Sequence, residues 1–571
     1  MKKEYRILSP SQSVVHALSG ELKCHSATAS VLVNRGISSS ETAIEFLSDN
    51  LKYFRSPVAV RDMDKAIRRI TTALEKKESI LIFGDYDVDG VTATALFLEF
   101  FNQVGARATY YIPHRTKEGY GLDVHHIHRI AVPKKIDLII TVDCGSSSHE
   151  AVKAACEAGI DVVITDHHYT LPPLPPAEAI VNPNRPDCGA GFGMLAGVGV
   201  VFAVLICLRK HLRDRNFWPP DREPNLKTLC DLVAMGTVAD IVPLRKENRL
   251  LTKTGLQVIN SRNRAGTKAL EAAAGLGARP LTAEDIAFRL APRINAAGRI
   301  AHAACAVRLL TTRKEDKAQR IASLLNRLND KRRRTEQEIL SQIITYFRAT
   351  PVVLQRNALV LKHPNWHEGV LGIVAAKLVE RYYRPVVLIS IRNGIGKGSA
   401  RSIPGFHMYD GLGKTNSHLE RFGGHAMAAG LQIQADRIDA FREAFETVVA
   451  ENTRREDFIP KIDIDRELPL DAITPKLVDE LEALQPFGQD NSEPIFMARN
   501  VPVVFSRIVG NGHRQFRLKS SRASSSAVFS AIQFNINPET PPPTFLERIA
   551  FKIRWNHWRG EKTIQLIIEA T

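Results

Sequence analysis

The sequence predicts an α/β protein with a parallel sheet in its first half and a β-barrel at its carboxy-terminal end. Apolar runs at residues 80–84, 136–142 and 160–165 alternate with helix-like segments at 92–104 and 146–158, as strands do when crossover helices join them in a parallel sheet. After Pro460 short alternating stretches replace this pattern, which is typical of an antiparallel barrel. These stretches are residues 501–508, 515–518, 526–532, 549–555 and 563–568.

Length and charge set the broad class of protein. At 571 residues the chain is too long for one hydrophobic core and should form several domains. The net charge of +16 favours a polyanionic partner, and residues 332–334 and 507–522 are the candidate contact stripes, unless they are only solvated basic faces. Seven cysteines without paired spacing favour a reducing compartment, so we expect a cytoplasmic protein. We expect no membrane association, because neither a secretory signal nor a membrane-spanning apolar run is present.

Acidic side chains and imidazoles stand where the apolar runs end. Because ligands bind beyond the carboxyl ends of parallel strands, we expect these groups to meet at one sheet edge, where their mutual repulsion demands a bound cation. A fourth apolar run, residues 232–239, is expected to bring the last of these carboxylates to the same edge. The groups are Asp85, Asp87, Asp89, Asp143, Asp166, His167, His168 and Asp240.

Two ordinary explanations compete with a catalytic metal site. An Asp-x-Asp-x-Asp-Gly run also opens an EF-hand calcium loop, but loop position twelve is Leu96 where that loop needs a glutamate. A solvated turn is the other alternative. Carboxylates with one or two imidazoles suit Mn²⁺ or Mg²⁺, and two such ions can hold and hydrolyse a phosphodiester.

Four motifs resemble those of the DHH phosphoesterases, and most closely the RecJ family of single-stranded-DNA-specific exonucleases. They are Asp85-Tyr-Asp-Val-Asp-Gly, Val142-Asp143-Cys-Gly, Asp166-His-His and Gly236-Thr-Val-Ala-Asp240. Supporting motifs are Ile112-Pro-His-Arg115, Gly119-Tyr-Gly-Leu122, Leu195-Ala-Gly-Val-Gly199, residues 290–299 and residues 485–490. The resemblance implies a 5′ to 3′ exonuclease that releases mononucleotides from single-stranded DNA in repair and recombination, with two Mn²⁺ or Mg²⁺ ions.

The resemblance also implies a role for each motif residue. Asp87 and Asp89 would bind the two metals, Asp143 would bridge them, and His167 with Asp240 would complete the second site. Asp85 and Asp166 would be ligands or would orient ligands. His168 would stabilise charge on the phosphate in the transition state, while Cys144 is expected to fill a tight turn rather than to act as a nucleophile.

A second group of glycine-rich motifs resembles the DHHA1 substrate-binding domain. Residues 366–375 and 423–430 each predict the start of a helix, and residues 398–402 follow an extended run. Taken singly, each glycine pair is more often an ordinary helix start. The resemblance implies that this group grips nucleic-acid phosphates through Ser399, Arg401, Ser402, Gly423, Gly424 and His425.

Composition and periodicity predict five segments. They are a helical lead-in (1–60), a metal-bearing domain (61–310), a connecting helix (311–349), a further domain (350–455) and a barrel (456–571). The resemblance implies that the second, fourth and fifth are a DHH catalytic domain, a DHHA1 domain and an OB-fold. In the barrel, Phe516, Phe534, Trp555 and Trp558 are candidates for stacking on bases, with core packing as the alternative for at least half of them.

Two other functions remain open from the sequence. One is a DHH phosphodiesterase acting on short oligonucleotides or cyclic dinucleotides, and the other is a nucleic-acid-binding scaffold whose metal only stabilises the fold. We expect a monomer, and the family suggests a single-strand-binding protein and a helicase as partners. Sequence physics alone does not fix polarity, processivity, the choice between Mn²⁺ and Mg²⁺, or tolerance of RNA.

Overall fold

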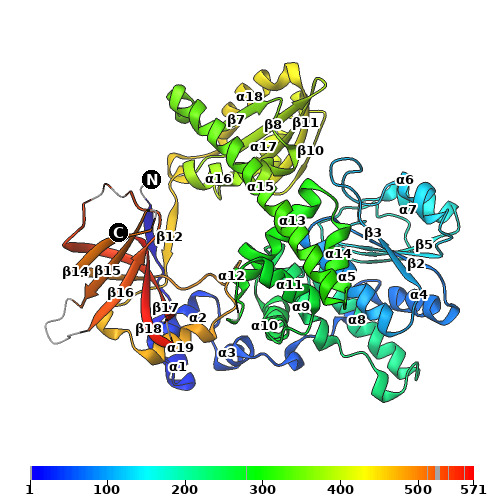
Figure 1. Ribbon diagram of the computed structural model, residues 1–571, viewed down its shortest axis with the longest axis horizontal. Helices are drawn as coiled ribbons and strands as arrows, with labels where there is room; N and C mark the ends of the chain where they lie inside the picture. The colour runs from blue at the N-terminus through cyan, green and yellow to red at the C-terminus, as the bar shows by residue number, and fades with distance from the viewer. Residues whose placement is uncertain are drawn as a thin grey trace.

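The computed structural model describes residues 3–277, 279–510, 512–520, 527–537, 539, 541–558 and 560–571, except for the side chains of Pro220 and Trp558. A long helix joins two α/β units, and a barrel lies to one side of them (Figure 1). Within the described part of the chain, no helix combines the length and apolar character needed to cross a membrane.

The first sheet is parallel throughout, with strand order β3-β2-β4-β5-β6. Alternate residues of β2 enter two different cores: Ile80 and Ile82 pack with α4, α5 and α8, whereas Leu81 and Phe83 pack with α7. Burial on both faces explains why these strands are continuous apolar runs. The strands are β2 (Ile80–Gly84), β3 (Ala108–Tyr111), β4 (Leu138–Val142), β5 (Asp161–Thr165) and β6 (Ala179–Val181). The helices are α4 (Met63–Lys76), α5 (Val88–Gln103), α6 (Val124–His126), α7 (His149–Glu157) and α8 (Gly197–Asp214).

A helical layer completes the first unit and corrects one expectation. The run that precedes Asp240 is a helix, α9 (Cys230–Ala239), and not a strand of the sheet. The further helices are α10 (Lys246–Asn260), α11 (Ala265–Ala273), α12 (Ala283–Asp285), α13 (Ala291–Ile300) and α14 (Ala304–Thr311). Helix α15 (Glu315–Ala349) follows, with 35 residues and a length of about 50 Å. Figure 1 shows it leading from the first unit to the second.

The second sheet is mixed, with strand order β10-β11-β9-β8-β7. Residues 423–430 do not start a helix, as the sequence had predicted, but form the β10–β11 hairpin. The side chains that follow alternate, with Ala429, Leu431 and Ile433 buried, which is the period of a strand. The strands are β7 (Leu359–His363), β8 (Val386–Arg392), β9 (Ile395–Arg401), β10 (Arg421–Gly424) and β11 (Ala428–Gln434). The helices are α16 (Leu371–Tyr382), α17 (Met408–Gly413) and α18 (Ile438–Asn452).

The carboxy-terminal strands close into a five-stranded barrel, β14-β15-β16-β18-β17, because β17 also pairs with β14. One pair, β16 with β18, is parallel, so the barrel is not wholly antiparallel as expected. Phe516 is buried in the barrel core and Phe534 is exposed, while the Trp555 indole donates to Asp479. The side chain of Trp558 lies outside the described residues. The strands are β14 (Phe496–Val509), β15 (His513–Lys519), β16 (Val528–Gln533), β17 (Phe545–Trp558) and β18 (Glu561–Ala570).

The amino-terminal segment packs against the barrel rather than leading into the first sheet. Strand β1 (Glu4–Ile7) pairs with β12 (Lys461–Ile464), and Figure 1 shows the amino terminus beside the barrel. Helices α1 (Gln12–Leu22), α2 (Ser26–Asn34) and α3 (Ser40–Leu47) share one core with α19 (Pro475–Ala483) and the barrel strands. Segments from opposite ends of the chain therefore belong to one folded body.

Candidate metal centre

The carboxyl ends of three adjacent strands bring the predicted ligands together. Gly84, Val142 and Thr165, the last residues of β2, β4 and β5, stand in register, so the residues that follow them leave the sheet at one level. Asp85, Asp143 and Asp166 are those residues, and all three are buried. Asp87 caps α5 by accepting hydrogen bonds from the N–H groups of Asp89 and Gly90, and Asp240 caps the end of α9.

The first group of possible ligands consists of Asp85, Asp87 and Asp143, which each offer an oxygen within 4.8 Å of the others. Within the described part of the chain, one buried oxygen of Asp85 and one of Asp143 have no hydrogen-bond partner. Burial, together with the neighbouring carboxylates, raises the pKa of both groups well above the usual range. Orphaned, buried oxygens of like charge are the donor set that a divalent cation would satisfy.

The second group consists of Asp89, His167 and Asp240. The His167 Nε2 atom lies 3.1 Å from Asp143 Oδ1, 3.6 Å from Asp240 Oδ2 and 3.8 Å from Asp89 Oδ2. None of these approaches has the geometry of a hydrogen bond, so among the described residues this nitrogen too is without a partner. Burial and the adjacent His168 lower the pKa of His167 to about 4. His167 is therefore neutral at pH 7, the form that binds metals, and Asp143 lies within reach of both groups.

Two glycines make room for this arrangement. The backbone N–H groups of Gly197 and Val198, at the start of α8, donate to Asp89 at 2.6 and 2.8 Å. A Cβ atom on Gly197 would lie 2.8 Å from Asp143, and one on Gly236 would lie 2.8 Å from Asp89. The sequence showed both glycines inside motifs, but their role in clearing space for carboxylates needed coordinates.

Asp166 serves a different purpose from the other acids. It accepts hydrogen bonds from the N–H groups of Ser146, His167 and His168 at 2.8 to 3.1 Å, and from His168 Nδ1 at 2.8 Å. Burial alone would raise the pKa of Asp166, but the bond and charge of His168 lower it to about 2. Asp166 is absent from every ligand group that the described residues form.

His168 is held as a cation facing the centre. Burial alone would lower its pKa, but Asp166 raises it to about 9, so the imidazolium persists at neutral pH. The Tyr120 hydroxyl lies 3.1 Å from His168 Nδ1 and donates to the backbone oxygen of Asp143 at 3.1 Å. Tyr120 stands in the Gly119-Tyr-Gly-Leu122 motif, but nothing in the sequence indicates this role.

The predicted phosphate-gripping residues divide into two kinds. Ser399 and Arg401 lie on β9, Gly423 and Gly424 end β10, and His425 follows, where burial and the charge of His168 lower the pKa of His425. The charge of His168 therefore influences the β10–β11 hairpin. Ser402 is buried, and its hydroxyl donates to the Phe406 carbonyl at 2.6 Å, so it shapes the loop instead of facing outward.

Three arginines from distant segments converge beside the centre. Burial, with Arg115 and Arg401 as cationic neighbours, lowers the pKa of Arg299 to about 9, and burial with Arg115 lowers the pKa of Arg401. Arg299 donates to the Gly369 carbonyl at 3.1 Å, and the Arg115 guanidinium lies 4.8 Å from the centre of the Tyr86 ring. Guanidinium groups gathered in this way suit a phosphate. Arg115 and Arg299 stood in quoted motifs but had been given no role.

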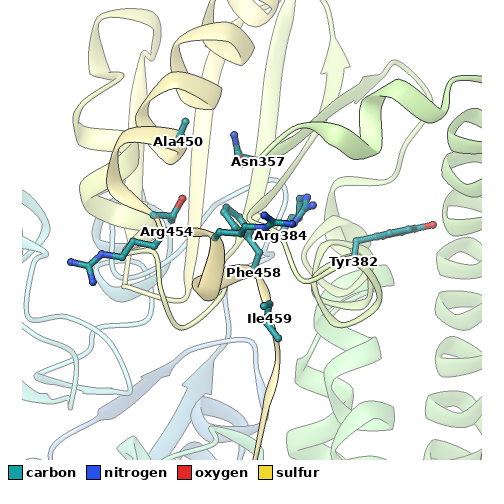
Figure 2. Close-up of a pocket in the computed structure, with 9 residues that line it drawn as sticks. Asn357, Tyr382, Arg384, Ala450, Arg454, Phe458 and Ile459 are labelled. Carbon is teal, nitrogen blue, oxygen red and sulfur yellow. The ribbon is translucent and has the colours of Figure 1, made fainter. Parts of the chain in front are cut away.

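A separate cavity of about 520 Å³ lies where the chain leaves α18 (Figure 2). Its wall includes the Arg384 guanidinium, which lies 4.9 Å from the centre of the Phe458 ring. The predicted site residues do not line it, so it is distinct from the metal centre. The lining residues are Asn357, Tyr382, Arg384, Ala450, Thr453, Arg454, Arg455, Phe458 and Ile459.

Comparisons with known proteins agree with this geometry. Family models match the DHH family, N-terminal domain, over residues 79–237, the DHHA1 domain over 355–451 and the RecJ OB domain over 464–570. The chain is 36% identical to the single-stranded-DNA-specific exonuclease RecJ of Bacillus subtilis, across 100% of this chain and 70% of that protein. RecJ of Thermus thermophilus in complex with Mn²⁺ matches with a TM-score of 0.82 and 29% identity, over 99% of this chain and 79% of that one. The same enzyme in complex with Mg²⁺ matches with a TM-score of 0.77 and 28% identity, over 99% and 78%.

Proposed function

The chain belongs to the RecJ family of single-stranded-DNA-specific exonucleases, and from this premise we propose that it hydrolyses single-stranded DNA from one end. The observation that carries the proposal is the pair of neighbouring ligand groups, in which Asp143 of the first group lies 3.1 Å from His167 of the second. Many enzymes that hydrolyse phosphodiesters bind two adjacent cations in such groups. Direction from 5′ to 3′, release of mononucleotides and a role in repair and recombination are part of the same proposal.

The ligand set fits Mn²⁺ or Mg²⁺. Asp85, Asp87 and Asp143 would hold one ion, and Asp89, His167, Asp240 and Asp143 the other. The unpartnered atoms of Asp85, Asp143 and His167 support this assignment, because buried polar atoms in native proteins are otherwise bonded. When bound, the two ions supply an activated water and neutralise charge on the phosphate.

The remaining residues of the centre position and polarise the substrate. Asp166 is a positioning residue that fixes the ring of His168 and keeps it protonated, so His168 can donate to a phosphate oxygen as negative charge develops. Tyr120 holds the backbone at Asp143 and reaches His168. Each of these groups is in place before substrate arrives, so reorganisation costs little during the reaction.

The phosphates adjoining the scissile bond would be bound by the arginine group. Arg115, Arg299 and Arg401 present guanidinium forks that match phosphate geometry. Ser399, His425 and the backbone of Gly423 and Gly424 would add donors from the second unit. A single strand bound between the metal ligands and these donors of the second unit would then meet protein groups on both sides.

Digestion of an end-labelled oligonucleotide tests the function. We expect Mn²⁺-dependent loss of the 5′ label as mononucleotide from single strands, and little cleavage of the same sequence as a duplex. The Asp143→Ala variant should lose cleavage by several orders of magnitude yet retain strand binding, because it removes the shared ligand and leaves the arginines and barrel intact.

A length series separates this function from the alternative phosphodiesterase. Faster cleavage of dinucleotides than of long strands would favour the alternative, and normal turnover by Asp143→Ala would overturn the metal assignment. Single-strand-binding protein and a helicase as partners, a monomeric state and a cytoplasmic location are further proposals. The unpaired state of all seven cysteines supports the last of these.

A further inference from the structure

Ile241, which follows the proposed ligand Asp240, has an unusual backbone. Its φ is +60°, a left-handed conformation in which the Cβ of a branched side chain crowds the following carbonyl. The side chain is 70% exposed, so packing within the protein does not explain its presence. At this position after a helix, glycine is the usual residue.

The surrounding structure forces this conformation. Asp240 still belongs to the last turn of α9, where its N–H donates to the Gly236 carbonyl at 2.9 Å. The buried Asn248 amide donates to the carbonyl of Pro243 at 3.0 Å, and the Leu244 N–H donates to the Gln489 carbonyl at 2.8 Å. These hydrogen bonds fix both ends of the turn and so hold the backbone of Ile241 in the left-handed conformation. Backbone strain of this kind persists mainly at functional sites.

A second exposed apolar residue, Met194, is held by the same asparagine as this turn. The same Asn248 amide that holds Pro243 also donates to the Met194 carbonyl at 2.6 Å, and Met194 is 44% exposed. Met194 stands three residues before Gly197, whose N–H holds the ligand Asp89. Ile241 thus directly follows one ligand of the second group, and Met194 precedes the helix start that holds another. The two residues are here termed the apolar ledge.

We propose that the apolar ledge contacts the bases or sugars of the strand end being cleaved, and so helps to select unpaired DNA. This inference rests on the proposed function. The arginine group serves the phosphates, whereas the ledge offers no donor or acceptor and suits the apolar face of any base, independent of sequence. In a duplex each base is stacked and paired, so its face is not free to lie on the ledge.

Steady-state kinetics of Ile241→Asn test the ledge, because asparagine tolerates the left-handed conformation while losing the apolar contact. We expect KM for single strands to rise about five- to tenfold, with little change in kcat and no fall in Tm. Val352→Asn is the matched control, since Val352 is 61% exposed in the turn after α15, and it should behave as wild type. Ile241→Val, which keeps the apolar side chain, should retain most of the affinity.

An oligonucleotide with abasic residues at the cleaved end tells which part of the strand is touched. If the ledge contacts bases, the wild-type protein and Ile241→Asn should have the same KM for this abasic strand, because neither can make the contact. An unchanged KM for Ile241→Asn, or a lower Tm, would overturn the proposal in favour of a purely structural residue. Failure of the wild-type protein to cleave any strand would instead overturn the proposed function.

Discussion

At the scale of single residues, the centre is a set of buried charges that the protein leaves unbalanced. Asp85 and Asp143 are 4% and 2% exposed, and burial with carboxylate neighbours raises the pKa of both. Protons must therefore leave when cations bind, so metal affinity should increase with pH. The acids stay close together in the folded protein because the strands that carry them end in register and because Gly197 and Gly236 leave space for their side chains.

Asp62 differs from these acids because cationic partners lower its pKa, and this gives a prediction on the pH dependence of stability. Its carboxylate accepts from Arg185 at 2.6 Å and lies 3.1 Å from Lys65. Burial alone would raise the pKa of Asp62, but these two partners lower it. A depressed pKa adds stability that is complete above the unfolded value of about 3.9 and is lost as pH falls through the folded value. Asp62→Asn should therefore cost about 2 kcal/mol of unfolding free energy at pH 7, and less below about pH 4.

Thermal unfolding from pH 7 to pH 3.5 measures this difference. Asp64→Asn is the control, because its pair with Arg68 has side chains 63% and 61% exposed and should contribute well under about 1 kcal/mol. A Tm difference for Asp62→Asn that stayed constant with pH would show that the lost hydrogen bonds, and not the charge, account for it.

Residue roles could be predicted in part. The sequence identified the acids and imidazoles but left Asp85 and Asp166 as equivalent candidates. Their separation depends on two loops: the N–H groups of His167 and His168, after β5, and that of Ser146, after β4, all donate to Asp166. Ser402 is a similar case, because burial of its hydroxyl follows from the hairpin that the sequence did not predict.

At the scale of elements, one buried arginine joins three segments. Arg249 of α10 donates to the carbonyls of Phe46, Leu484 and Gln485, each at 2.8 Å. The latter two stand at the end of α19, where a helix attracts a cation. Burial, with Arg35 as a cationic neighbour, lowers the pKa of Arg249 to about 9, and its charge is balanced by carbonyl dipoles. The first unit is thereby attached to the body that contains the barrel.

Replacing Arg249 by methionine should loosen this junction. The change keeps the bulk but leaves several buried carbonyls without donors, which should cost about 3 kcal/mol or more. Chemical denaturation would show a lower midpoint, and limited proteolysis should cut near residue 486 sooner than in the wild-type protein. Arg245→Met, at a guanidinium 44% exposed and 3.5 Å from Asp490, should have little effect. Equal stability of the two variants would contradict the account of the junction.

Elements were predictable where their periodicity was distinct. The runs ending at Gly84, Val142 and Thr165 form strands as expected. Residues 232–239 form a helix that is buried on nearly every side, and a wholly apolar segment carries no period that separates helix from strand. The prediction of a helix start at residues 423–430 was wrong for another reason. Paired glycines fit tight hairpins as readily as helix starts.

At the scale of the whole molecule, function depends on contacts between distant parts of the chain. The ligands span residues 85 to 240, the arginine group extends to residue 401, and the barrel body includes both ends of the chain. Pairing of β1 with β12, strengthened by the ion pair of Arg6 with Asp463 at 2.6 Å, leaves no local signal in the sequence. A helical lead-in could be predicted, but its attachment to the barrel could not.

Anomalous diffraction at the manganese edge, from crystals grown with Mn²⁺, tests the central claim most directly. The account predicts two peaks about 4 Å apart. One should lie among Asp85, Asp87 and Asp143, the other among Asp89, His167 and Asp240, with Asp143 touching both. A single peak, or peaks bound elsewhere while these side chains remain without metal, would contradict it.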